Sequence, residues 1–363
     1  MVLAEKATSS IQGIDGQPAV ELEVDSFRFC MVGDICSATA CGRIGRELLM
    51  AARGVELAVA LQSTKGYLYQ PEYPLSPFLK RLSERPASGK FRIHVQPFFA
   101  VPAEDRGIPW VVSGVPVTAA RDVSHDLLSA RRIWVFSEAQ RQALVDGGVP
   151  NVRIEVIRGA VNPEVFHLRV GPTPKLEASS RFRFLFSGHP LRRKGIDLIL
   201  RAYLEEFKPA EPVELVLKMT HMPKLKKQFS YEYADLAKRL GAINRIFPAV
   251  KVIAETWEDR DLAGLMTACQ AFLSVDRTYF TALGVREAMA CGLPVIGAEP
   301  LAGIVGLNKD IGFPVPVQTV RLPAGQLYPE SPESSVQEVN VPALRKSMRE
   351  AFAQPAATRR KGV

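Results

Sequence analysis

The sequence predicts two α/β domains that face each other across a cleft, each built on a doubly wound, Rossmann-like parallel sheet. The chain has 363 residues, which is too long for one ordinary core and suits two domains. Short apolar runs alternate with amphipathic segments of helix length almost throughout, which is typical of repeated strand and helix units around parallel sheets. Between two such series, residues 167–181 contain Pro172 and Pro174 and lack a consistent period, so we expect an interdomain linker there.

The first series predicts an N-terminal domain over residues 27–166. Residues 27–32 indicate a strand, 42–53 a helix and 55–61 a second strand, which together form an opening strand-helix-strand unit. Further strands are expected at 91–95, 110–112, 133–136 and 152–157, with a helix at 138–146. Residues 1–26 lack the basic start and apolar stretch of a secretion signal, so we expect a loosely ordered leader.

The second series predicts a C-terminal domain over residues 182–338, followed by a helix and tail over 339–363. Strands are expected at 182–186, 213–218, 250–253, 271–275 and 294–296, with helices at 196–207, 231–240, 262–269 and 285–291. Two facing domains of this kind place a ligand in the cleft between the ends of their strands.

Composition narrows the class of protein. Apolar residues make up 47% and charged residues 23%, and no stretch reaches the length of a membrane helix, so we expect a soluble protein. Five cysteines without a C-x-x-C pair favour neither a disulfide framework nor a zinc site and fit a reducing cytoplasm. The net charge of +8 is compatible with phosphorylated ligands, anionic lipid headgroups at a membrane surface or nucleic acid, although the basic residues are spread along the chain.

The segment F-R-F-L-F-S-G-H-P-L-R-R-K-G-I-D-L-I-L-R-A-Y, residues 182–203, predicts an anion site. An apolar strand leads into a turn with Arg192, Arg193 and Lys194, and a helix follows. Gly188 and Gly195 allow the backbone to approach a ligand, and the helix start offers N–H groups and the positive end of a dipole. An exposed basic turn is an equally weighted alternative for this segment taken alone.

The segment R-E-A-M-A-C-G-L-P-V-I-G, residues 286–297, predicts a helix that ends at Gly292 before another strand. Glu287 is expected at the helix start among small and apolar residues. Its carboxylate suits the hydroxyl groups of a ligand, and helix capping is the alternative, which this stretch alone would favour.

Together these segments resemble the retaining GT-B glycosyltransferases of the "glycosyl transferases group 1" family, which includes bacterial mannosyl- and glucosyltransferases. R-R-K-G-I-D at 192–197 is similar to the family's phosphate-binding segment, and E-A-M-A-C-G-L-P-V-I at 287–296 to its nucleotide-ribose segment. W-V-F-S-E-A-Q-R at 134–141 and V-I-R-G-A-V-N-P-E-V-F at 156–166 resemble the end of its N-terminal domain. The opening G-D-I-C-S-A-T-A-C-G-R-I-G-R-E-L-L at 33–49 resembles its glycine-containing first loop more loosely.

The resemblance implies a role for individual residues. Arg193 and Lys194 would bind the donor diphosphate and stabilise its charge during the reaction, and Glu287 would bind the nucleotide ribose. Gly42 would let the first loop close on the phosphates, and Gly188 lies at the phosphate-binding strand end.

Two positions depart from the family pattern. Tyr279 stands where members commonly have a glutamate that contacts the transferred sugar, which leaves sugar identity and activity open. His189 stands where many members have an arginine, so the phosphate clamp is expected to rely more on Arg192 and Arg193.

Three further groups are assigned more weakly. Residues 259–261 spell D-x-D, which holds a metal in a different glycosyltransferase fold, but here they precede an apolar helix pattern and are interpreted as a helix N-terminus. His125 is a candidate contact to acceptor or sugar from the N-terminal domain, with an ordinary surface histidine as the alternative. A basic and aromatic patch that could bind an anionic acceptor is one interpretation of Lys224, Lys226, Lys227, Phe229 and Tyr231. A solvated loop is the alternative for this segment.

The resemblance therefore predicts a hexosyltransferase that moves a sugar from a nucleotide-diphosphate sugar to an acceptor that the sequence does not identify, with retention and with neither metal nor cofactor. One alternative is a degenerate protein that binds the nucleotide sugar without transferring it. Others are an epimerase or phosphorylase of the same fold, or a nucleic-acid-modifying glycosyltransferase, which ranks low because charge alone is nonspecific. Relatives usually end in a helix that crosses back to the N-terminal domain, whereas this chain ends soon after an expected helix at 341–352.

Overall fold

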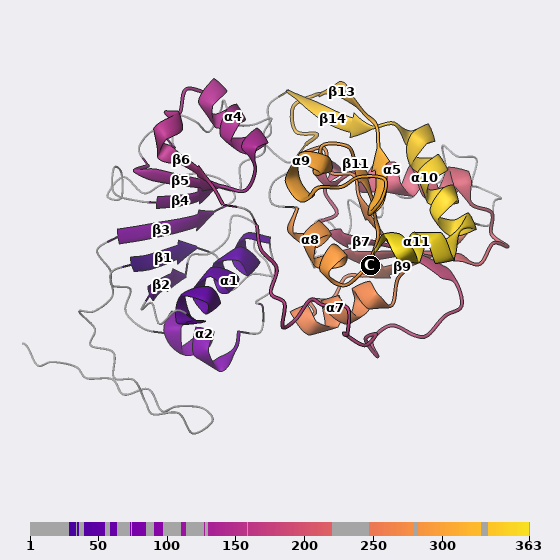
Figure 1. Cartoon of the computed structure of the whole chain (residues 1–363), viewed down its shortest axis with the longest axis horizontal. Helices are drawn as coiled ribbons and strands as arrows, with labels where there is room; N and C mark the ends of the chain where they lie inside the picture. The colour runs from indigo at the N-terminus through magenta and orange to yellow at the C-terminus, as the bar shows by residue number, and fades with distance from the viewer. Residues whose placement is uncertain are drawn as a thin grey trace, which may run out of the picture. The chain divides into compact units, whose positions relative to one another are not determined.

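The computed structural model of the chain describes residues 29–33, 35, 40–54, 59–63, 73, 75–84, 91–96, 110–113, 127, 130–157, 159–219, 247–278, 282–327 and 333–362 (Figure 1). Some of the predictions lie outside these residues, namely the leader 1–26, His125, the basic segment 224–227 with Phe229 and Tyr231, the helix 231–240, and Tyr279.

The N-terminal half contains a six-stranded sheet in the order β2-β1-β3-β4-β5-β6. Its elements are β1 (Phe29–Gly33), α1 (Ala40–Gly54), β2 (Val59–Ser63), α2 (Pro77–Ser83), β3 (Phe91–Gln96), β4 (Trp110–Ser113), β5 (Arg132–Val135), α4 (Glu138–Asp146) and β6 (Ile154–Val156). The pairs from β2 to β5 are parallel. Gly45 of α1 lies so close to β1 and Ile35 that a Cβ there would meet Ile35 Cγ2 at 2.8 Å, which explains a glycine inside this helix.

The C-terminal half contains a second six-stranded sheet, in the order β12-β11-β10-β7-β8-β9, and a separate hairpin. The elements are β7 (Phe182–Gly188), α5 (Ile196–Glu206), β8 (Val213–Met219), β9 (Ala249–Ile253), α7 (Asp259–Thr267), β10 (Ala271–Ser274), α8 (Leu283–Ala290), β11 (Val295–Ala298), α9 (Leu301–Val305), β12 (Gly312–Val315), the hairpin strands β13 (Val317–Leu322) and β14 (Ser334–Val339), α10 (Val341–Ala353) and α11 (Pro355–Lys361). All pairs within the six-stranded sheet are parallel, and the hairpin pair is antiparallel.

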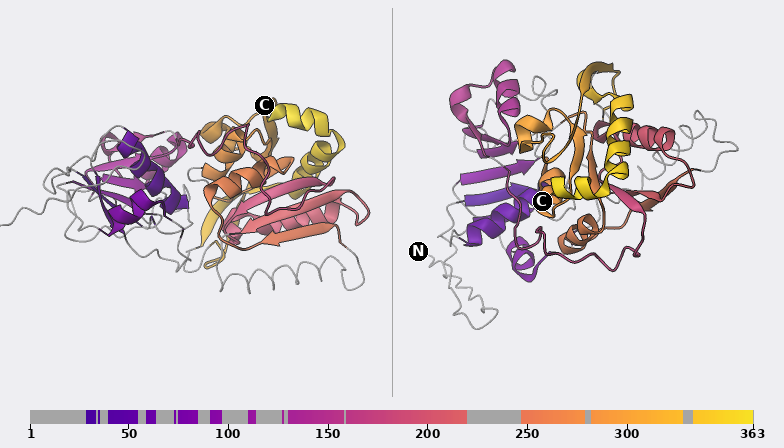
Figure 2. Two further views of the ribbon diagram at one scale, coloured as in Figure 1. Left: turned by 90° about the horizontal axis from the view of Figure 1, so that it is seen from below. Right: turned by 45° about the vertical axis from the view of Figure 1, so that its right-hand side comes forward.

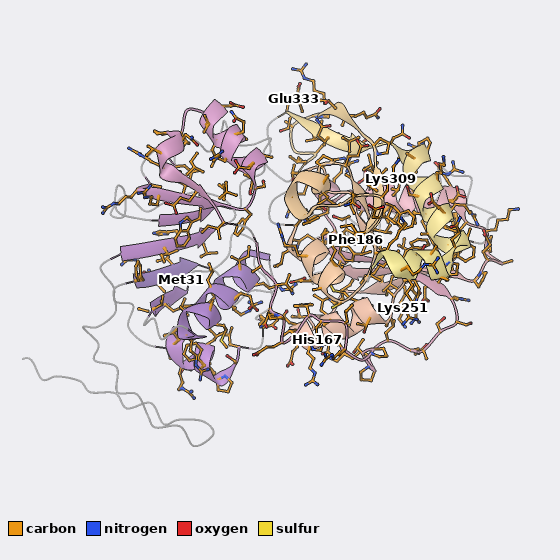
Figure 3. All side chains as sticks on the ribbon, in the orientation of Figure 1. Met31, His167, Phe186, Lys251, Lys309 and Glu333 are labelled. Carbon is orange, nitrogen blue, oxygen red and sulfur yellow. The ribbon has the colours of Figure 1, made fainter. Side chains whose placement is uncertain are left out.

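The core of the C-terminal half explains its continuous apolar strands. Phe184 and Leu185 are adjacent on β7, so they point to opposite faces of the sheet, yet both are fully buried. Phe186, labelled in Figure 3, continues the run and is also buried. A strand covered on both faces loses the alternation of apolar and polar residues, which is the pattern that the sequence shows here.

The described residues fall into two compact units. The first takes its residues from Met1–Gly114, His125–Trp134 and Val149–Glu155, and the second from Val115–Ser124, Val135–Gly148 and Val156–Val363. Figure 2 shows the strands of each unit side by side from two further directions. In the part of the chain that the structure describes, no helix combines the length and apolar character that crossing a membrane requires.

The end of α8 confirms the predicted role of Gly292. Gly292 has a φ of 73°, its N–H donates to Met289 O at 2.9 Å, and Leu293 N–H donates to Ala288 O at 2.9 Å. These two bonds are the paired bonds of a glycine-terminated helix. A side chain at this position would also collide with Leu168, whose Cδ2 lies 2.4 Å from the ideal Cβ site.

Candidate functional site

The carboxyl ends of β7 and β10 form the topological switch point of the second sheet. β7 is the first of these strands in the chain, β8 and β9 extend the sheet on one side of it, and β10, β11 and β12 extend it on the other. β7 and β10 pair in parallel, so the loops that follow them emerge at the same sheet edge. Ligands of doubly wound folds bind at this point, where the two loops diverge.

The loop after β7 is the predicted basic turn. Arg192–Lys194 form one turn of 3₁₀ helix, and Gly195 links it to α5 with a φ of 69°. Gly195 is required for space as well, because a Cβ there would lie 2.4 Å from Val275 O. Val275 directly follows β10, so this glycine allows the two loops to touch.

The three cations of the turn have different surroundings. Arg193 is buried, whereas Arg192 is exposed and its Nη1 donates to Gln326 Oε1 at 2.7 Å. Lys194 Nζ donates to Asp276 Oδ2, which joins the β7 loop to the β10 loop by an ion pair. The turn is thus not a simple exposed basic loop, because two of its cations are drawn into the protein.

The ammonium group of Lys194 is largely buried beside Asp276. Burial lowers the pKa of Lys194; Asp276 opposes this effect and Arg193 adds to it, and the net shift is downward. An anion that enters beside Lys194 would favour its charged form, because an opposite charge raises the pKa of a lysine.

His189 follows Gly188, the last residue of β7, and is partly buried. Burial, and then the charges of Arg193 and Lys194, lower its pKa to about 3, so the imidazole is neutral at physiological pH. Its Nδ1 is buried and makes no hydrogen bond to any residue that the structure describes. A neutral imidazole therefore occupies the position where the family resemblance leads one to expect a cation.

The loop after β10 contains two buried residues that the sequence analysis did not single out. Arg277 is 2% exposed and hydrogen-bonds to the basic turn, to Asp197 of α5 and to Glu338 of β14. Thr278 is also 2% exposed, and among the described residues its Oγ1 has no hydrogen-bond partner. The signal available in the sequence was D-R-T directly after a continuous apolar strand, where charged and polar residues mark the sheet edge.

Glu287 lies on α8, but not at its start as the sequence analysis expected. The helix begins at Leu283, which makes Glu287 its fifth residue, and the residue is 2% exposed. A glutamate that caps a helix occupies the third helical position, here Val285, so the capping alternative does not fit. The Glu287 charge, after burial, contributes to raising the pKa of Cys291 to about 11, which keeps that thiol protonated.

The backbone before α8 is strained. Ala282 has a φ of 49°, a left-handed conformation that residues with a Cβ rarely adopt. Such strain is concentrated at functional sites, where the surrounding structure maintains it.

The segments 156–166 and 286–297, both in the second unit, lie next to each other. The segment 156–166 passes α8 at Gly159, where a Cβ would lie 3.1 Å from Arg286 Nε. Arg286 Nη2 also donates to Ile304 O at 2.6 Å, which fixes the helix that carries Glu287. An open groove of about 450 Å³ lies nearby, between residues 163–169 and Ala290, with His167 (labelled in Figure 3) in its lining. None of the predicted site residues that the structure describes lines this groove.

The remaining predicted residues are placed as follows. Asp259 and Asp261 lie in the first turn of α7, which confirms the helix N-terminus, and Asp261 pairs with Lys175 at 2.5 Å. Gly42, the first residue of the helix predicted at 42–53, lies in the first turn of α1 and belongs to the first unit. Among the described residues, no group of three or more His, Cys, Asp or Glu is arranged to hold a metal ion.

The two parallel, doubly wound sheets have the GT-B fold, and solved glycosyltransferase structures confirm this fold prediction. Sucrose-phosphate synthase from Thermosynechococcus elongatus is similar with a TM-score of 0.63, at 15% identity over 92% of each chain. WaaG, a glycosyltransferase involved in lipopolysaccharide biosynthesis, gives 0.60 at 16% identity over 93% of each chain. HepE of Anabaena in complex with UDP-glucose gives 0.61 at 14% identity over 93% of each chain. No family model and no curated protein matches the chain.

Proposed function

We propose that this chain is a glycosyltransferase that takes its sugar from a nucleoside-diphosphate sugar bound at the ends of β7 and β10. The observation that carries the proposal is the basic turn 192–194, placed at the switch point of a GT-B fold with Arg193 and Lys194 drawn inward. Cations held in a partly desolvated turn suit a diphosphate, which carries its charge in a compact group.

In this proposal Lys194 shares its charge between Asp276 and the donor diphosphate. During transfer the bond between the anomeric carbon and the diphosphate oxygen breaks, a bond to the acceptor oxygen forms, and the acceptor hydroxyl releases its proton to water. Negative charge then grows on the departing diphosphate, and Arg193 and Lys194 stabilise it, which is preorganised electrostatic catalysis. Gly188, His189, Arg192 and Glu287 complete the donor side, with Glu287 accepting hydrogen bonds from the ribose hydroxyl groups.

Further parts of the proposal come from the family resemblance. They are retention of configuration, a hexose as the transferred group, independence of metal and cofactors, and contacts from Gly42 and Tyr279. A cytoplasmic location, which the cysteine content favours, and a contact from His125 complete the proposal. HepE binds UDP-glucose, which supports a nucleotide sugar as the donor and makes uridine nucleotides the first ligands to test.

The experiment combines a donor panel with one variant. Glu287→Gln should weaken binding of a nucleoside diphosphate and of its sugar nucleotide alike, because glutamine retains one carbonyl oxygen where the carboxylate offers two acceptors. Titration calorimetry measures both affinities for the UDP, GDP and ADP series. Glu350→Gln, which alters an exposed carboxylate on α10, is the matched control.

Release of nucleoside diphosphate from a sugar donor, followed by NMR, then separates a transferase from a protein that only binds. Binding of a nucleotide sugar without release in the presence of any acceptor fraction would favour the degenerate protein. Failure of the parent to bind every member of the panel would refute the proposal.

A further inference from the structure

Arg277 connects three parts of the second unit. Its side chain is 1% exposed, and its guanidinium binds Asp197 through two parallel hydrogen bonds, Nη1 to Oδ1 at 2.7 Å and Nη2 to Oδ2 at 2.8 Å. Its Nε donates to Glu338 Oε2 at 2.7 Å. Burial alone would lower the pKa of Arg277, but the hydrogen bonds and charges of Asp197 and Glu338 raise it overall, so the group stays charged.

The same residue holds the basic turn through its backbone. Arg277 Nη1 donates to the carbonyl of Arg192, and Arg277 N–H donates to the carbonyl of Arg193 at 2.7 Å. The two carbonyls directly before Lys194 are thus fixed by one residue of the neighbouring loop. A planar guanidinium with several donors can fix a turn in this way, whereas a flexible ammonium group cannot.

The β13–β14 hairpin takes part in this arrangement at two points. Glu338 of β14 binds Arg277, and Gln326, between the two strands, accepts from Arg192. The hairpin has a small core of its own, made by Leu322, Leu327 and Val336, which gives these polar residues a fixed base. A buried arginine with two carboxylates stabilises a fold weakly compared with apolar packing, but it specifies geometry well.

We propose that Arg277 is a positioning residue for diphosphate binding, and that the β13–β14 hairpin is part of the donor site through Glu338 and Gln326. Arg277 need not touch the ligand. Arg277 fixes the backbone conformation of the turn that carries Lys194, and the hairpin fixes the position of the Arg277 side chain. This inference rests on the proposed function, because it assigns the turn to a diphosphate.

Arg277→Lys tests the proposal while it keeps a positive charge beside both carboxylates. We expect the dissociation constant for UDP to rise about tenfold, which corresponds to the loss of one charge-assisted hydrogen bond between the turn and the diphosphate. The dissociation constant for uridine should change less than about twofold. Arg349→Lys is the matched control, because Arg349 also binds two acidic residues, Glu206 and Glu211, but at the far end of α5. Equal losses for UDP and uridine, or equal losses in both variants, would overturn the positioning role.

Glu338→Gln and Gln326→Ala test the hairpin. The first removes the negative charge that pairs with Arg277, the second removes the acceptor for Arg192, and both leave the sequence of the turn intact. Both should weaken UDP binding by less than Arg277→Lys and leave uridine binding unchanged. UDP affinities equal to the parent's in both variants would remove the hairpin from the donor site.

Amide hydrogen exchange separates this inference from the proposed function. In Arg277→Lys, exchange at residues 191–195 should be faster than in the parent, and exchange in α10 should be unchanged. If the parent binds no nucleoside diphosphate, the proposed function fails. Faster exchange at 191–195 would then show only that Arg277 stabilises the turn, and the positioning role in diphosphate binding would be refuted as well. If the parent binds UDP but exchange at 191–195 does not change, the inference alone fails.

Discussion

Gly195 and Gly306 share a left-handed backbone, with φ values of 69° and 75°, but differ in their surroundings. A Cβ at Gly306 would meet no atom of the described residues within 4 Å, whereas one at Gly195 would meet Val275 O at 2.4 Å. Gly195 thus allows the contact between the β7 and β10 loops, and Gly306 only ends α9.

Gly306→Ala should lower the free energy of unfolding by about 1 to 2 kcal/mol, the cost of the left-handed conformation. Gly195→Ala should cost a further 1 kcal/mol or more, roughly the penalty of overpacking. Urea unfolding of both variants and the parent measures the difference. Equal losses would mean that the two loops do not touch as described.

His189 makes the protein sensitive to acid. Its pKa is about 3 in the folded state and 6.5 in the ordinary case, so the unfolded state binds the proton more readily between these values. Stability contributed by the neutral imidazole is complete above pH 6.5 and is lost as pH falls toward 3. The slope approaches about 1.4 kcal/mol per pH unit in that window.

In His189→Gln, the free energy of unfolding should therefore fall less between pH 7 and pH 5 than it does in the parent. Urea unfolding at the two pH values measures this difference. His167→Gln, in the lining of the groove, controls for the loss of a histidine. If the free energy of unfolding falls by the same amount in the parent and in His189→Gln between the two pH values, His189 is protonated more easily than the structure indicates.

At the scale of elements, the sequence predicted strands best where both faces are buried. The strands β7, β8 and β10 are mostly apolar and mostly buried, and α4 has the predicted bounds, Glu138–Asp146, with Ser137 accepting from Gln140 N–H as its N-cap. Such local signals are strong because capping and burial act within a few residues.

The elements that were not predicted are short or depend on distant partners. α2 and α9 have 7 and 5 residues, too few for a clear periodicity. The β13 and β14 strands mix polar and apolar residues and pair across a loop. Arg277 was missed for the same reason, since its importance comes from Asp197 and Glu338, which lie 80 and 61 residues away in sequence.

The D-x-D segment at the start of α7 bears on whether donor binding needs a metal ion. Asp261 there binds Lys175 at 2.5 Å and accepts from Thr173 Oγ1 at 3.3 Å, so the D-x-D carboxylate is engaged in the fold. UDP affinity measured by calorimetry should be the same with a chelator as with added magnesium or manganese. A loss of affinity on chelation that is reversed by metal would require a metal site in the donor complex.

At the scale of the molecule, the net charge of +8 does not by itself define a nucleic-acid surface. In the described part of the second unit, basic side chains often bind acidic neighbours, as Arg183 does Glu214 at 2.6 Å and Arg349 does Glu206 at 2.8 Å. Such pairs neutralise each other, and in the basic turn Lys194 is paired with Asp276 in the same way, so the net charge alone does not mark a binding surface.

The central claim is that the turn after β7 binds a diphosphate through Lys194. Lys194→Ala should weaken UDP binding by about 1.5 to 3 kcal/mol, the range for a hydrogen bond between charged groups, and leave uridine binding nearly unchanged. Titration calorimetry of both ligands with the parent and the variant measures this directly. Unchanged UDP affinity, or equal losses for UDP and uridine, would contradict the account.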